Sequence, residues 1–265
     1  MEQNLLNAAF SFCENAEILK TQIIDNNLPA EDHRRKSVFD ILEIFVRVNT
    51  RGVSPRRSDT IQSILRLYWE DASDILPTFI REINERIGIE IDTDFMLRCM
   101  FSAAGIGTRL DFELLHKKSN VERIRETHTD CFQAVRSVVD FVRTDCGIDS
   151  ARLLGGIGTL VPFVQYAFDA EKHRFRKQTM DAARKSLFLF AFTKVFGQYA
   201  ESRTGAFIRD CLSDAKTIHE GASFPYDKAI LFVYEKTNFD MPDDTFFGNN
   251  PELALASTEE KWRNY

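Results

Sequence analysis

The stretch at residues 121–142, VERIRETHTDCFQAVRSVVDFV, indicates the fold class of this chain of 265 residues. Its apolar residues recur at spacings of three and four, which is the period of a helix with one buried face. The side chains that share this face are Ile124, Cys131, Val135, Val138, Val139 and Val142. The stretch therefore predicts a long amphipathic helix.

Similar apolar patterns predict further helices on both sides of this stretch. Glycine, proline and asparagine mark most of their ends, as expected for helix boundaries. The chain has only 12 glycines and 7 prolines, and it contains no convincing run of alternating strands. The further predicted helices cover residues 2–26, 37–48, 58–69, 75–87, 95–104, 160–170, 179–200, 204–214 and 224–235.

These patterns predict a mainly α fold, an irregular multi-helix bundle. We expect a helical domain over residues 1–236 and an irregular C-terminal tail over residues 237–265. The 23 phenylalanines indicate a large aromatic core, because each buried ring removes a large apolar area from water. We assign a run of four rings near the end of the domain to this core: Phe188, Phe190, Phe192 and Phe196.

Charge, cysteine usage and hydropathy limit the compartment and the partners. The net charge of −6 argues against a protein that holds DNA with its whole surface, so any DNA contact must come from a local basic patch. Five scattered cysteines without a C-x-x-C pair are typical of reduced thiols in a cytoplasmic protein. No apolar stretch reaches the roughly 18–20 residues that cross a bilayer, so we expect no membrane contact.

Motifs of self-contained active sites are missing. The sequence contains no P-loop, no G-x-G-x-x-G, no H-E-x-x-H and no G-x-S-x-G. His128 and Cys131 have the spacing of half a metal site, but a half-buried histidine beside a core cysteine is the favoured interpretation. Asp92 and Asp94 precede a predicted helix and are interpreted as a cap. We predict no catalytic residue, no metal site and no cofactor for this chain alone.

The most distinctive loop lies within residues 44–59, IFVRVNTRGVSPRRSD. Asn49 and Gly52 tolerate the left-handed backbone of a tight turn between two helices. Four arginines surround this turn and create a local positive field, which suits phosphate or carboxylate. The alternative is that these arginines pair with the many acids of the chain. The candidate phosphate-binding residues are Arg47, Asn49, Arg51, Gly52, Arg56 and Arg57.

This loop also carries a family resemblance. Phe45, Arg47, Asn49, Gly52, Ser54 and Asp59 resemble the F-x-R-x-N motif region of the bacterial GmrSD-type restriction family, which has a ParB/sulfiredoxin-like domain. Arg51 and residues 55–57 depart from the family pattern. Residues 69–72, 196–200 and 207–210 are similar as well, and the resemblance extends over roughly residues 15–235.

The resemblance implies a setting in modification-dependent restriction or anti-phage defence. The family's Asp-Gly-Gln-Gln-Arg motif, tied to nucleotide hydrolysis or nuclease activity, is absent, and so is the His-Asn-His nuclease domain of many relatives. We therefore expect an accessory or interaction module that is not catalytic alone. Its basic loop would complete a nucleotide or DNA-phosphate site with a partner subunit, and any nucleotide or divalent metal would require that partner.

Two other functions stay open, a diverged modification-dependent DNA nuclease and a simple DNA-binding module. A second candidate surface consists of Gln198, Arg203 and Arg209, although a solvated helix end is the favoured interpretation of these residues.

Overall fold

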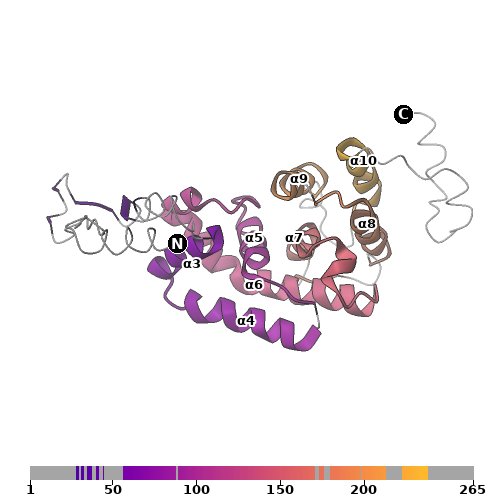
Figure 1. Cartoon of the computed structure of the whole chain (residues 1–265), viewed down its shortest axis with the longest axis horizontal. Helices are drawn as coiled ribbons and strands as arrows, with labels where there is room; N and C mark the ends of the chain where they lie inside the picture. The colour runs from indigo at the N-terminus through magenta and orange to yellow at the C-terminus, as the bar shows by residue number, and fades with distance from the viewer. Residues whose placement is uncertain are drawn as a thin grey trace, which may run out of the picture. The chain divides into compact units, whose positions relative to one another are not determined.

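The computed structural model describes residues 28–29, 31–32, 35–37, 40–41, 44, 56–87, 89–170, 173–175, 180–197, 199–212 and 223–237. The chain divides into two compact units, Met1–Pro55 and Arg56–Tyr265. All the helices labelled in Figure 1 belong to the second unit. The described part of the chain contains helices and no strand, so the predicted mainly α fold is confirmed.

Eight α-helices and several short helical turns form the described part of the second unit. The α-helices are α3 (Arg57–Tyr68), α4 (Ala72–Ile87), α5 (Thr93–Ala103), α6 (Lys118–Thr144), α7 (Val161–Asp169), α8 (Met180–Thr193), α9 (Ala200–Phe207) and α10 (Tyr226–Lys236). The short turns are η1 (Phe112–His116), η2 (Ala151–Leu154), η3 (Ile157–Leu160) and the π-helical η6 (Ile208–Leu212).

The long helix α6 organises this unit. Helices α4, α5 and α7 all pack against it, and Figure 1 shows it running beneath α5 and α7. The apolar stripe predicted from the sequence is buried: Ile124, Cys131, Val135, Val138, Val139 and Val142 are each 0% exposed. The predicted amphipathic helix is therefore confirmed, with ends at Lys118 and Thr144.

Aromatic rings join α7, α8, α9 and α10. The Phe207 ring lies 5.2 Å from the Phe190 ring and 5.2 Å from the Phe232 ring, measured between centroids. Phe163 stacks on Phe224 at 4.6 Å. Such pairs contribute about 0.5–1.5 kcal/mol each beyond the apolar area that they bury. The predicted aromatic core is confirmed for these rings.

One ring of the predicted core lies on the surface. Phe192 is 78% exposed, whereas Phe190 is fully buried and Phe196 is 5% exposed. Successive positions on a helix point in different directions, so α8 buries the face that carries Phe190 and leaves Phe192 in solvent. The assignment of Phe192 to the core is therefore wrong.

The predicted helix over residues 179–200 is two elements. Helix α8 ends at Thr193, and α9 begins at Ala200. Between them, Lys194 has a φ of 49° and Tyr199 a φ of 58°, which are left-handed conformations that an α-helix excludes. The prediction missed this break because the apolar spacing continues through it. Thr204, predicted to start the next helix, lies inside α9.

The described residues before α3 support one predicted cap. The Ser37 hydroxyl accepts from the Asp40 main-chain N–H at 3.1 Å, and the Asp40 carboxylate accepts from the Ser37 N–H at 2.7 Å. This reciprocal pair is a capping box, so the predicted helix start at Ser37 is confirmed. The predicted helix over residues 2–26 lies outside the described residues, as does most of the one over 37–48. The predicted domain boundary near residue 236 stays a prediction.

Candidate functional site

The described structure contains two of the six predicted phosphate-binding residues. Arg56 immediately precedes α3, and its main-chain carbonyl accepts from the N–H groups of Asp59 and Thr60 at 3.1 and 3.2 Å. Arg57 is the first residue of α3. Both arginine side chains are exposed. Arg47, Asn49, Arg51 and Gly52 lie outside the described residues.

Arg57 reaches a carboxylate that a second arginine also contacts. Arg98 Nη2 lies 2.9 Å from Glu201 Oε1, and Arg57 Nη1 lies 3.8 Å from Glu201 Oε2. We call these three side chains the arginine–glutamate cluster. They come from α5, α3 and the first turn of α9. The Thr108 hydroxyl donates to the Glu201 main-chain carbonyl at 3.1 Å and so fixes the start of α9.

The two ion pairs of the cluster differ in strength. The Arg98 and Glu201 side chains are 22% and 28% exposed, so their contact is partly shielded from water. The Arg57 side chain is 62% exposed, and its longer contact is screened by solvent. Arg57 can therefore leave Glu201 at little cost, whereas Arg98 is held in place.

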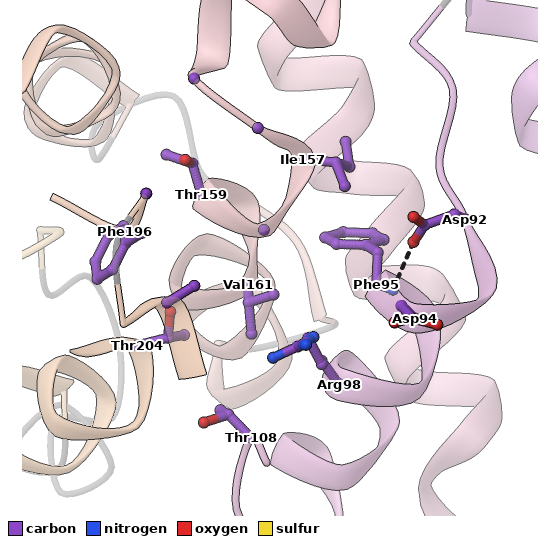
Figure 2. A pocket seen from close by; sticks show the side chains of 15 residues that line it. Asp92, Asp94, Phe95, Arg98, Thr108, Ile157, Thr159, Val161, Phe196 and Thr204 are labelled. Carbon is purple, nitrogen blue, oxygen red and sulfur yellow. Dashed lines mark hydrogen bonds between the residues drawn. The ribbon is translucent and has the colours of Figure 1, made fainter. Parts of the chain in front are cut away.

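A cavity of about 320 Å³ lies beside this cluster. Its walls come from the first turns of α5, from the glycine-rich segment at residues 155–158 and from the start of α9. Figure 2 shows the Arg98 side chain reaching from α5 toward Val161, with Asp92 and Asp94 on the α5 side. The other lining side chains include Phe95, Thr108, Ile157, Thr159, Phe196 and Thr204.

The glycine-rich segment exposes its backbone to the cavity. Gly155 and Gly156 have φ values of +69° and +136°, which only glycine adopts easily. A Cβ atom built on Gly156 or Gly158 would meet nothing within 4 Å. The main chain at these two residues therefore borders open space.

Of the two acidic residues that line the cavity, Asp92 has a clear structural role. The Asp92 carboxylate accepts from the Phe95 N–H at 2.8 Å and caps α5 (Figure 2). The sequence-based interpretation of Asp92 as a cap is confirmed. Asp94 lies in the first turn of the same helix, where a carboxylate interacts favourably with the helix dipole.

In the second candidate surface, Arg203 and Arg209 bind different groups of the chain. Arg203 Nη1 donates to the Val195 carbonyl at 2.9 Å, and its guanidinium lies 5.7 Å from the centre of the Tyr199 ring. Arg209 donates to both carboxylate oxygens of Asp210 at 2.8 and 3.0 Å, and these bonds raise the pKa of Arg209. Gln198 lies outside the described residues.

The groups that were considered for metal or nucleophilic chemistry are used in packing. His128 Nδ1 lies 2.6 Å from the Arg125 carbonyl, and its ring packs against Trp69 at 4.7 Å. Burial raises the pKa of the Cys131 thiol to about 12. In the described part of the chain, no three His, Cys, Asp or Glu side chains gather as a metal ion requires.

Neither Arg98 nor Glu201 was among the residues predicted from the sequence. A signal for Arg98 existed, because an arginine within the apolar run FMLRCMF needs a partner when the helix is buried. Glu201 is one of many acids and gives no signal of its own. The glycine-rich segment at residues 155–158 lies beside Arg98 only because of the fold.

Comparison with protein-family models and with curated proteins gives no match. The GmrSD-type resemblance therefore stays a prediction. Among the described helices, none is long and apolar enough to cross a membrane.

Proposed function

We propose that this chain is a helical interaction module, not catalytic by itself, that binds the phosphates of a nucleotide or of DNA. The observation that carries the proposal is the convergence of Arg57 and Arg98 on the single carboxylate of Glu201. Two guanidinium groups around one carboxylate retain an excess positive charge, and guanidinium suits the oxygens of phosphate.

The sequence supports the same surface. Arg57 is the last arginine of the stretch at residues 44–59 that was predicted to bind phosphate. The stretch also carries the GmrSD-type resemblance, which makes modification-dependent restriction or anti-phage defence the proposed setting. A partner that supplies the Asp-Gly-Gln-Gln-Arg motif or a nuclease domain belongs to this proposal.

Fluorescence anisotropy with a short labelled DNA duplex and with a fluorescent ATP analogue tests phosphate binding by the full chain. We expect weak binding at low salt that declines as salt rises, because phosphate contacts release counterions. Arg57→Ala should weaken it. Arg66→Ala is the matched control, since Arg66 is an exposed arginine in the last turn of the same helix. Absence of binding to both probes at low salt contradicts the proposal.

The non-catalytic part of the proposal has its own test. The purified chain is incubated with DNA or with ATP and a divalent metal, and products are followed over time. We expect no turnover. Robust metal-dependent hydrolysis that Arg47→Ala abolishes would contradict the proposal and favour the diverged nuclease.

A further inference from the structure

Glu201 contacts Arg98, and Arg98 also lines the neighbouring cavity. We propose that the cavity beside Arg98 binds a phosphate monoester, and that Glu201 is a built-in competitor which this phosphate displaces. The inference rests on the proposed phosphate-binding function. It adds where the phosphate binds, that it is a monoester, and that Glu201 competes with it.

Arg98 can bind a ligand without leaving its place. Its Nη2 atom contacts Glu201 Oε1 at 2.9 Å, and the side chain also lines the cavity. A guanidinium has five N–H donors, and one carboxylate uses two of them at most in a bidentate pair. Donors therefore remain for a second oxyanion. If the Glu201 side chain swings away, all five become available.

The opposite wall offers main-chain groups. Gly156 and Gly158 line the cavity without side chains, so a phosphate oxygen can approach the peptide N–H groups closely.

The acids and the volume favour a terminal phosphate over a continuous DNA backbone. Asp92 and Asp94 lie on the α5 side of the cavity and would repel a polyanion passing over them. A monoester phosphate can enter between Arg98 and the glycine-rich segment and avoid that side. The cavity of about 320 Å³ is at the small end of the range of about 300–1,000 Å³ that ligand pockets occupy.

Isothermal titration calorimetry on the full chain with AMP tests the competition. Glu201→Gln retains the main-chain carbonyl that accepts from Thr108 and replaces the carboxylate by a neutral amide of the same size. We expect it to raise the affinity for AMP by about threefold to tenfold. Glu85→Gln makes the same change of charge at an exposed position on α4 and should leave the affinity unchanged. Unchanged or lower affinity in Glu201→Gln overturns the competitor role.

A double-mutant cycle assigns the effect to Arg98. Arg98→Ala should lower the affinity for AMP by about tenfold or more, and Glu201→Gln should produce no gain in that background. Gly158→Val serves if Arg98→Ala fails to fold, because Gly158 lines the cavity and a Cβ built on it meets nothing within 4 Å. Affinity that survives in the folded Gly158→Val variant overturns the placement.

Two oligonucleotides distinguish the sources of the phosphate. A single-stranded oligonucleotide with a 5′-phosphate should bind Glu201→Gln more tightly than the same oligonucleotide with a 5′-hydroxyl. Equal affinities would overturn the monoester inference. Another outcome is that the DNA duplex binds the wild type while Glu201→Gln shows no higher affinity for AMP and no preference for the 5′-phosphate. In that outcome the inference fails and the proposed function stands. The proposed function fails separately when neither the duplex nor the ATP analogue binds the wild type.

Discussion

At the scale of single residues, two neighbouring acids have different tasks. Asp92 caps α5 through its bond to the Phe95 N–H at 2.8 Å, whereas Asp94 is already inside the helix. Their spacing resembles a catalytic pair, but the hydrogen bond identifies Asp92 as a stabilising group. The difference gives a direct comparison between two carboxylates of the same helix end.

Asp92→Ala should lower the free energy of unfolding by about 1 kcal/mol, the usual effect of removing an N-cap acceptor. Asp94→Ala should lower it by a few tenths of a kcal/mol, because only the interaction with the helix dipole is lost. Urea unfolding followed by circular dichroism measures both. Equal losses in the two variants would contradict the cap assignment.

The buried thiol of Cys131 makes stability depend on alkaline pH. Burial raises its pKa to about 12 in the folded protein, whereas an unfolded cysteine has a pKa of about 8.5. Above pH 8.5 the unfolded chain releases the thiol proton and the folded chain retains it. The unfolded state then binds fewer protons, so the stabilisation present below pH 8.5 is lost as the pH rises toward the folded pKa.

Between pH 7.5 and pH 9.5, Cys131 alone should lower the free energy of unfolding by about 1.4 kcal/mol. Cys131→Ala removes this contribution, so the variant should lose less stability than the wild type over the same interval. Urea unfolding at the two pH values gives the comparison. Identical losses in wild type and variant would show that the Cys131 thiol does not cause the dependence.

At the scale of elements, Asn84 fixes the connection between α4 and α5. Its side-chain carbonyl accepts from the Ile91 N–H at 2.8 Å, and its amide donates to the Ile91 carbonyl at 3.0 Å. The Asn84 side chain therefore satisfies both main-chain polar groups of Ile91, as a neighbouring strand would in a sheet. Ile89 and Ile91 are thereby held in the core at 0% and 2% exposure.

Asn84→Ala should destabilise the protein by about 1–3 kcal/mol, because two main-chain groups of a buried residue lose their partner. Glu85→Ala, at the next and exposed position of α4, should change stability by less than about 0.5 kcal/mol. Thermal unfolding of both variants compares them. A loss in Asn84→Ala no larger than that in Glu85→Ala would refute this role.

At the scale of the whole molecule, the aromatic core connects the C-terminal helices of the second unit. The Phe207 ring contacts those of Phe190, Phe196, Phe224 and Phe232 at centroid distances of 5.2, 6.1, 6.1 and 5.2 Å. These rings belong to α8, to α9 and α10, and to the segments beside them. One ring at the centre therefore supports several elements together.

Phe207→Ala should lower the free energy of unfolding by about 3–5 kcal/mol, the cost of a cavity in a packed core. Phe192→Ala removes an equal ring that is 78% exposed, so it should change stability by less than about 0.5 kcal/mol. Urea unfolding of both variants provides the measurement. Similar losses would contradict the division of these rings between core and surface.

Features that depend on local spacing could be predicted from the amino-acid sequence. The apolar period over residues 121–142 predicted α6, the Ser37 cap was recognised from its position before a helix, and Asp92 was identified as a cap. These features depend on residues within one or two turns of each other, where helix geometry fixes which side chains meet. For the same reason the mainly α fold was predictable without any tertiary information.

Features that depend on contacts between distant residues became visible with the fold. Phe192 has the same ring as Phe190, and only the packing of α8 shows which one is buried. Arg57, Arg98 and Glu201 are far apart in the sequence and meet because α3, α5 and α9 bring them together. Ion pairs between elements have no fixed spacing along a chain, so the candidate phosphate site was visible only in part from the amino-acid sequence.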